Sequence, residues 1–261
     1  MKCSVCGEEV GNVSVCPICG TGMQPAPAYV PPAAPVAAPA AAAPAPAAPA
    51  PAVAAHMSGA DLFERCVNGV LEIYIIDGKT CFSGSGYLVN DEGYAVTNSH
   101  VVVNNGKVAS ECMVTIAGEK VRARVLQALT KSDFTSNKDL ALIRLEKVPP
   151  KARPICFGDS SKVRTGENIY IIGNSLGRGT LMTRGIISDN DRGGQFMYDS
   201  ATNGGNSGGP VFNEDGCVIA THVAGSLSNS GEKNVQGMNI GIPCTYAKAL
   251  LSANRVDFKT D

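Results

Sequence analysis

The chain has 261 residues, with 22 Lys and Arg against 23 Asp and Glu, so its formal net charge is −1. This balance argues against a protein that binds nucleic acid by neutralising phosphates. No apolar run approaches the roughly 18 residues that cross a bilayer, and the first residues lack the apolar core of a signal peptide. We therefore expect no membrane span, no nucleic-acid partner and a cytoplasmic location.

The first predicted element is a small metal-folded head over residues 1–23. Cys3 and Cys6 form one pair and Cys16 and Cys19 another, each with two residues between the cysteines and a glycine after them. Two such pairs can hold one zinc ion by four thiolates. Disulfides or a redox pair are the alternatives, but no secretion signal or βαβ context favours them. The head resembles short zinc-ribbon modules, and we expect a structural zinc whose binding supplies its folding energy.

A linker is predicted over residues 24–57. From Gln24 to Ala55 the sequence has ten Pro, 17 Ala and five other residues, none of them charged. Proline removes backbone donors and alanine methyl groups bury too little apolar surface to offset chain ordering. The composition therefore predicts a disordered, semi-rigid spacer of polyproline II character.

The body, residues 58–261, is predicted to be all-β with a short helix near each end. Short runs rich in β-branched residues alternate with turn signals such as Asn90–Gly93 and Asn213–Gly216. The expected strands are 70–76, 87–89, 94–97, 113–116, 141–145, 169–172, 185–188, 211–212, 218–223 and 239–242. The expected helices are 61–66 and 246–253. This spacing is typical of a sandwich or a barrel.

Three segments of the body carry residues suited to nucleophilic catalysis. His100 is expected to close a strand, Asp139 precedes an apolar strand, and Ser207 lies in the glycine-rich segment Asn203–Pro210. A serine hydroxyl needs an imidazole to remove its proton, and the imidazole needs a buried carboxylate to fix its tautomer. The spacings of 39 and 68 residues place the three on separate β-elements, which a cleft between two barrels would bring together.

The body resembles the trypsin-like serine proteases of the chymotrypsin fold, and the HtrA (Deg) family in particular, from about Leu62 to Leu251. Beyond the three segments above, the likeness rests on Gly84–Gly93, Phe157–Glu167, Ile171–Gly177 and Asn239–Pro243. It implies a double β-barrel and a serine endopeptidase that cuts protein substrates, including misfolded or damaged ones, through an acyl-enzyme.

The resemblance also assigns roles. By it His100 is the general base, Asp139 its orienting carboxylate and Ser207 the nucleophile. The backbone N–H groups of Gly205 and Ser207 would form the oxyanion hole, which needs donors preset where negative charge develops. No cofactor is expected for catalysis, and protein or peptide substrates are the expected partners.

Two competing interpretations of these motifs are weaker. Gly205–Gly209 also fits the nucleophile elbow of α/β hydrolases, but that motif needs a following helix, and here Pro210 and a predicted hairpin follow. His222 lies in an alternating apolar run and is expected to be a strand residue near the cleft. A non-enzymatic binding or chaperone-like module on a protease fold is the alternative from another functional class.

Departures from secreted trypsins bear on activation and specificity. Asn206 stands where those enzymes carry the Asp that binds a new N-terminal amine, so an attached head is compatible with activity. Ala201 stands six positions before the serine, where trypsin has an acidic residue, so cleavage after Lys or Arg is not expected. By the HtrA likeness Thr202, Met238 and Ile240 line the primary specificity pocket, which would favour small or medium aliphatic side chains.

The remaining expectations concern cysteines and assembly. The six cysteines of the body, at positions 66, 81, 112, 156, 217 and 244, are expected to be buried free thiols of a reducing compartment. The chain stops ten residues after Leu251, which leaves no room for the PDZ domain of most HtrA proteins. The family often forms trimers, so the resemblance allows a homo-oligomer, and the partner of the zinc ribbon is unknown.

Overall fold

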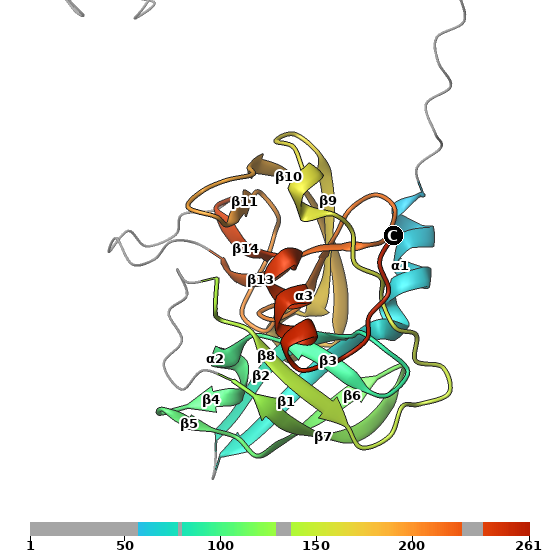
Figure 1. Cartoon of the computed structure of the whole chain (residues 1–261), viewed down its shortest axis with the longest axis vertical. Helices are drawn as coiled ribbons and strands as arrows, with labels where there is room; N and C mark the ends of the chain where they lie inside the picture. The colour runs from blue at the N-terminus through green and yellow to red at the C-terminus, as the bar shows by residue number, and fades with distance from the viewer. Residues whose placement is uncertain (1–56, 78–79, 129–136, 226–236) are drawn as a thin grey trace, which may run out of the picture. The chain divides into compact units, whose positions relative to one another are not determined.

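Two closed antiparallel barrels of six strands each make up the described part of the chain (Figure 1). The computed structural model describes residues 57–77, 80–128, 137–225 and 237–261. The predicted head and nearly all of the predicted linker lie outside these residues. The expectation of an all-β, chymotrypsin-like double barrel with short helices near both ends of the body is confirmed.

The first barrel has the strand order β1-β2-β3-β8-β7-β6. Its strands are β1 (Val70–Asp77), β2 (Thr80–Leu88), β3 (Tyr94–Thr97), β6 (Glu111–Ile116), β7 (Glu119–Gln127) and β8 (Ala141–Leu145). A separate ribbon is formed by β4 (Val103–Asn104) and β5 (Lys107–Val108). In β6 the side chains of Cys112, Val114 and Ile116 are buried and alternate with more exposed ones. This alternation is expected of a strand with one face in a core.

The second barrel has the strand order β10-β11-β14-β13-β12-β9. Its strands are β9 (Asn168–Asn174), β10 (Thr180–Asp189), β11 (Phe196–Tyr198), β12 (Pro210–Phe212), β13 (Val218–Gly225) and β14 (Asn239–Pro243). Its interior is an apolar cluster that includes Ile169, Ile171, Ile187 and Val211. The sequence supplies no Trp, so aliphatic side chains fill much of this space.

Three short α-helices and three 3-10 turns complete the described part. The helices are α1 (Gly59–Cys66), α2 (Ser99–Val102) and α3 (Cys244–Ala253), and the turns are η1 (Val67–Gly69), η2 (Ser160–Lys162) and η3 (Ser175–Gly177). Helix α1 starts at a side-chain cap, because the Ser58 hydroxyl accepts a hydrogen bond from the N–H of Asp61.

A separate apolar cluster contains residues of both barrels and joins them. Val96 and Leu142 of the first barrel, Ile172 and Val223 of the second, and Leu251 of α3 all belong to it. Figure 1 shows α3, in red, at the boundary between the green and the yellow-orange strands. Because burial of large apolar side chains stabilises folding by roughly 1.5–3 kcal/mol each, this shared core fixes one barrel against the other.

Several elements differ from those predicted. Strand β7 was not expected, because polar residues occupy every second position from Lys120 to Arg124 and conceal the buried Val121 and Ala123. Helix α2 also differs, since β3 ends at Thr97 and His100 lies in the helical turn that follows. The expectation that His100 closes a strand is therefore wrong by about one helical turn.

The prediction of free thiols is wrong for two of the six cysteines. Cys156 and Cys217 form a disulfide, with their Cα atoms 5.1 Å apart. A β-bridge between the next residues, Phe157 and Val218, holds the two chain segments side by side. A pairing across 61 residues depends on this tertiary contact and leaves no trace in the cysteine spacing.

The other body cysteines are free thiols, and three of them are buried. Burial raises the pKa of Cys66 to about 11 and that of Cys112 to about 12, so both remain protonated near neutral pH. Cys244 is also buried, whereas Cys81 is exposed, contrary to expectation.

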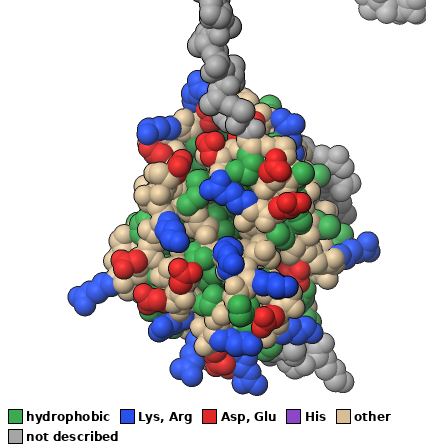
Figure 2. Space-filling view, turned by 90° about the vertical axis from the view of Figure 1, so that its right-hand side faces the viewer, with side chains coloured by type: hydrophobic (Ala, Val, Ile, Leu, Met, Phe, Trp, Pro, Cys, Tyr) green, Lys and Arg blue, Asp and Glu red, His purple; other side chains and the backbone are tan. Residues whose placement is uncertain are grey.

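The surface carries interspersed charges. On the face shown in Figure 2, basic and acidic side chains lie among one another. Within the described residues, no helix has the length and apolar character needed to cross a membrane.

Candidate active site

His100 and Asp139 are in direct contact in the first barrel. Nδ1 of His100 lies 2.6 Å from Oδ2 of Asp139, and the backbone N–H of His100 donates to Oδ1 at 3.0 Å. Asp139 is fully buried, whereas the His100 side chain is 19% exposed. An ionised carboxylate can only accept hydrogen bonds, so in the neutral imidazole Nδ1 carries the hydrogen and Nε2 keeps its lone pair.

Two neighbouring side chains hold the backbone at Asp139 in place. Asn98 Nδ2 donates to the backbone oxygen of Asp139 at 2.6 Å, and Ser99 Oγ donates to that of Leu140 at 2.8 Å. These bonds tie the start of α2 to the segment before β8. The approach of Asp139 to His100 is therefore set by the backbone as well as by the hydrogen bond to the imidazole ring.

Ser207 lies in a turn between β11 and β12 in the second barrel. Gly205 and Gly208 flank it with φ angles of 97° and 85°, a region that favours glycine. Backbone hydrogen bonds of 2.8 Å from Gly208 N to His222 O and from His222 N to Gly209 O fix the turn against β13. The Ser207 hydroxyl donates to the backbone oxygen of Val223 at 2.9 Å.

The segment before Ser207 presents backbone donors. The backbone oxygen of Gly204 accepts a hydrogen bond of 2.7 Å from Leu176 N. In a trans peptide the C=O and the following N–H point in opposite directions. The N–H of Gly205 therefore points away from Leu176, and within the described part of the chain neither it nor the Ser207 N–H donates to a backbone oxygen.

The three residues predicted to line the specificity pocket are connected through Asn239. Thr202 Oγ1 donates to Asn239 Oδ1 at 2.5 Å, and Asn239 Nδ2 donates to the backbone oxygens of Ser200 at 2.7 Å and Tyr198 at 3.2 Å. Met238 and Ile240 are the neighbours of Asn239 in the chain. The sequence contains no signal that could have singled out Asn239, because its role depends on strand pairing.

His222 is buried beside the site, as its alternating pattern suggested. It is 1% exposed, and its Nδ1 lies 2.6 Å from the hydroxyl of Tyr198, which donates to the backbone oxygen of Ile240 at 3.1 Å. The single proton of that hydroxyl is used there, so His222 Nδ1 donates to Tyr198. Burial, and secondarily the charge of His100, lower the pKa of His222 to about 3.

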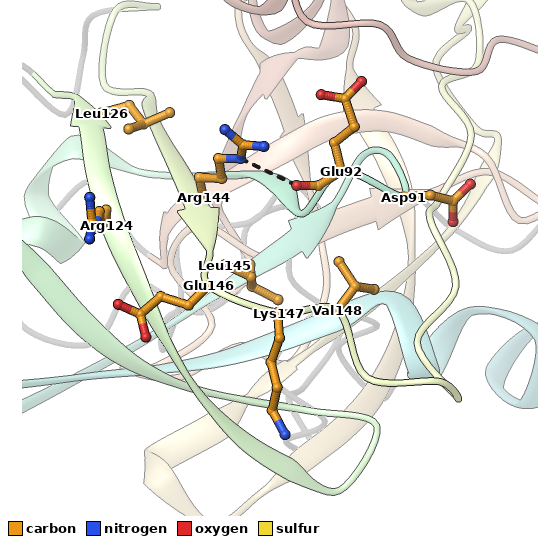
Figure 3. A pocket seen from close by; sticks show the side chains of 9 residues that line it. All are labelled: Asp91, Glu92, Arg124, Leu126, Arg144, Leu145, Glu146, Lys147 and Val148. Carbon is orange, nitrogen blue, oxygen red and sulfur yellow. Dashed lines mark hydrogen bonds between the residues drawn. The ribbon is translucent and has the colours of Figure 1, made fainter.

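Two cavities lie on the first barrel. One of about 510 Å³ opens beside His100 and is also lined by Phe82, Val101, Lys107 and Val108. The larger, of about 780 Å³, is shown in Figure 3 and contains none of the predicted site residues. There Arg144 Nε donates to the backbone oxygen of Glu92 at 3.3 Å, and charges of both signs line the walls.

The predicted zinc ligands Cys3, Cys6, Cys16 and Cys19 lie outside the described residues. Among the residues that the structure does describe, no three His, Cys, Asp or Glu side chains form a group that could hold a metal ion.

Comparisons with known proteins point to one family. Residues 84–220 match the model of the trypsin-like peptidase domain. A probable periplasmic serine endoprotease DegP-like of Brucella suis is 32% identical over 175 residues, covering 64% of this chain and 32% of its own length. A probable serine protease do-like of Buchnera aphidicola is 36% identical over 184 residues, covering 67% and 36%. The chain spans about a third of the length of these relatives.

Solved structures agree in fold. An HtrA-type protease AlgW with tripeptide is 28% identical, with a TM-score of 0.63 and coverage of 76% of this chain and 63% of its own. The serine endoprotease from Yersinia pestis shares the fold at 24% identity and a TM-score of 0.63, over 77% and 67% of the two chains.

These names overturn one prediction. The Brucella relatives are named periplasmic proteins, so the expected cytoplasmic location is wrong. That expectation rested on the first residues of the chain and on the lack of a long apolar run, and it led in turn to the free-thiol expectation that the Cys156–Cys217 disulfide contradicts.

Proposed function

Because the chain belongs to the family of trypsin-like peptidase domains, we propose that it is a serine endopeptidase that hydrolyses peptide bonds of protein substrates. The observation that carries this proposal is the pair of hydrogen bonds from His100 to the fully buried carboxylate of Asp139, in a fold that presents Ser207 on a glycine-rich turn. The serine endoprotease names of the relatives support it.

His100 acts first as a base and then as an acid. The Ser207 hydroxyl turns from the backbone oxygen of Val223 toward Nε2 of His100, which removes its proton while Oγ attacks the carbonyl carbon of the substrate. The imidazolium then gives this proton to the leaving amine as the C–N bond breaks. Water attacks the resulting acyl-enzyme by the same route and restores Ser207.

Asp139 stabilises the imidazolium that forms in each step. Both of its carboxylate oxygens accept hydrogen bonds from His100, one from the ring and one from the backbone. The backbone N–H groups of Gly205 and Ser207 form the oxyanion hole, where they stabilise the negative charge of the tetrahedral intermediate. All of these groups belong to the chain itself, so no cofactor takes part in the reaction.

The two halves of a substrate occupy different barrels. The oxyanion hole and the pocket residues Thr202, Met238 and Ile240 belong to the second barrel and hold the acyl half. The cavity beside His100 belongs to the first barrel. Because His100 delivers the proton to the leaving amine, this cavity receives the side chains that follow the scissile bond.

The proposed organisation of the whole chain has three parts. Residues 1–23 form a zinc ribbon held by Cys3, Cys6, Cys16 and Cys19, residues 24–57 form the linker, and residues 58–261 form the protease domain. The ribbon brings the protease to a partner or takes part in the assembly of a homo-oligomer. The spacing of the two cysteine pairs supports the zinc site.

Labelling with a fluorophosphonate tests the proposal directly. The full chain should form a covalent adduct at Ser207, and Ser207→Ala should not label. Asp139→Asn should label about 10³–10⁴-fold more slowly, because the imidazole loses its orienting charge, whereas Asp159→Asn at an exposed site should label like the parent. A folded parent that neither labels nor cleaves protein substrates would instead favour a binding or chaperone-like module.

A further inference from the structure

Ser85, a buried residue of β2, makes four hydrogen bonds at the boundary between the barrels. Its backbone N–H donates to the oxygen of Ser207 at 2.8 Å, and its backbone oxygen accepts from Thr97 Oγ1 at 2.6 Å. Its hydroxyl donates to the oxygen of Gly205 at 2.7 Å and accepts from the N–H of Asn174 at 2.8 Å. The Ser85 side chain of the first barrel thus bonds two segments of the second barrel, one at Gly205 and one at Asn174.

The bond to Gly205 bears on the oxyanion hole. The Gly204–Gly205 peptide is oriented by Leu176 N, which donates to the Gly204 oxygen, and the next peptide is oriented by Ser85, which donates to the Gly205 oxygen. Both peptide planes around Gly205 are therefore fixed. Glycine has a wide range of backbone conformations, so this residue needs such bonds if its N–H is to keep one direction.

The site of the hydroxyl is closed to water and to larger side chains. Ser85 is fully buried. A Cβ atom on Gly173 would lie 2.8 Å from Ser85 Oγ, and one on Gly209 would lie 3.2 Å from Ser85 Cβ. The neighbouring glycines thus leave room for a side chain of the size of serine or cysteine and for little more. If the hydroxyl is lost, no solvent can replace its bonds to the Gly205 oxygen and the Asn174 N–H.

Ser85 also reaches the catalytic histidine through the chain. Thr97, which donates to the Ser85 oxygen, is the last residue of β3 and lies three positions before His100. We propose that Ser85 is a positioning residue that holds the oxyanion segment at Gly205 and Ser207 in register with the histidine segment. This inference rests on the proposed function. It gives the buried hydroxyl a role in the rate of acylation that is separate from substrate binding.

The substitution Ser85→Ala removes the hydroxyl and keeps both backbone bonds. We expect kcat for a peptide with Val before the scissile bond, and the rate of fluorophosphonate labelling, to fall about tenfold or more. The loss should stay below the roughly 10²–10³-fold effect of deleting an oxyanion donor itself. The Kd of the same peptide, measured in the Ser207→Ala background with and without Ser85→Ala, should change less than about threefold. A purely structural role would change both quantities together.

Ser160→Ala is the matched control. Ser160 is also a buried serine, and its hydroxyl is bonded to Thr245 Oγ1 at 2.5 Å, outside the site. It should lose stability to a similar degree and keep the kcat of the parent. A Ser85→Ala kcat within twofold of the parent, or equal factors in kcat and Kd, would overturn the inference.

Two further results separate the possible failures. If Ser85→Ala does not fold, Ser85→Cys tests the inference instead. A thiol is a weaker donor than a hydroxyl, so this variant weakens the bond to the Gly205 oxygen. A severalfold loss of kcat at unchanged KM supports the inference, and parent-like kcat overturns it. A parent chain that neither cleaves peptides nor labels contradicts the proposed function itself. An active parent whose kcat is unchanged by substitution of Ser85 contradicts this inference alone.

Discussion

At the scale of single residues, His222 is a buried ionisable group whose surroundings keep it neutral. It packs against the ring of Tyr198 and donates Nδ1–H to that hydroxyl. Its pKa is about 3, against 6.5 for a free side chain. The unfolded chain therefore binds a proton between these two values that the folded chain does not bind, so stability rises with pH over this range and is lost as pH falls.

The burial of neutral His222 against Tyr198 predicts that the stability of the folded chain depends on pH. Lowering the pH from 7.5 to 5 should decrease the free energy of unfolding by on the order of 2 kcal/mol through His222 alone. In His222→Asn this contribution is absent, and the difference in stability between parent and variant should shrink at pH 5. Urea denaturation of both proteins at the two pH values measures it. A difference that is independent of pH would contradict the burial of a neutral imidazole.

At the scale of elements, the turn before β12 depends on the conformation of its glycines. A methyl group on Gly205 would collide with the backbone oxygen of Asn174, and the φ angle of 97° is unfavourable for any other residue. Gly118, in the turn between β6 and β7, has a φ angle of 80° but open space around it. The two glycines share a positive φ angle and differ in the steric contact that a methyl group would make and in their distance from the candidate active site.

Alanine at these two glycines should therefore have different effects. Gly205→Ala should lower kcat by about 10²-fold or more, because the peptide that we propose to carry an oxyanion donor must move. Gly118→Ala should destabilise the fold by about 1 kcal/mol and leave kcat unchanged. Peptide hydrolysis and thermal unfolding of both variants provide the measurements. Parent-like hydrolysis by Gly205→Ala would show that this segment does not form the oxyanion hole.

The segments that follow β11 and begin β14 supply the proposed specificity pocket and so predict which residue is preferred before the scissile bond. Ala201 supplies no carboxylate, so a Lys or Arg side chain that entered beside Thr202 and Ile240 would lack a charged partner at that position. Peptides with Val, Ala or Leu before the scissile bond should be cleaved faster than peptides with Arg. The measurement is kcat/KM for peptides that differ only in the residue before the scissile bond. A clear preference for Arg would refute the assignment of Thr202, Met238 and Ile240 to the specificity pocket.

At the scale of the whole molecule, the disulfide ties the connection between the barrels to the β12–β13 hairpin. Closing a loop of 61 residues restricts the unfolded chain. Replacing Cys156 and Cys217 together by alanine should lower the free energy of unfolding by about 2–4 kcal/mol. Cys81→Ala at an exposed free thiol should change it by less than about 0.5 kcal/mol. Equal denaturation curves for the double variant and the parent would contradict a structural disulfide.

The predicted head gives a second prediction at this scale. The full chain should contain about one zinc ion per molecule, because four thiolates complete a tetrahedral site. Replacing Cys3 and Cys6 by serine should remove the metal, whereas Cys81→Ser should retain it. Metal analysis of the purified proteins gives the result. A zinc-free parent chain in which Cys3 and Cys6 are oxidised would falsify the zinc site.

Much of the fold could be predicted because its signals are local. Short apolar runs mark β3, β8 and β13, and the residue types and order of His100, Asp139 and Ser207 suggest a triad. Strand β7 and helix α2 were missed because polar outward residues and a short turn give little periodic signal. Ser85 and Asn239 were missed for another reason. Each acts through backbone groups of segments distant in sequence, to which side-chain patterns are insensitive.

The sequence by itself determined the classes of residue available for chemistry, the β-rich character of the body and its likeness to trypsin-like proteases, since these follow from local composition and order. Only the tertiary structure decided that Cys156 meets Cys217, that Asp139 is fully buried against His100, and that Ser85 holds Gly205. Such contacts depend on how the two barrels pack around a shared core. Their geometry is set by the burial of many side chains at once, and no single stretch of sequence encodes it.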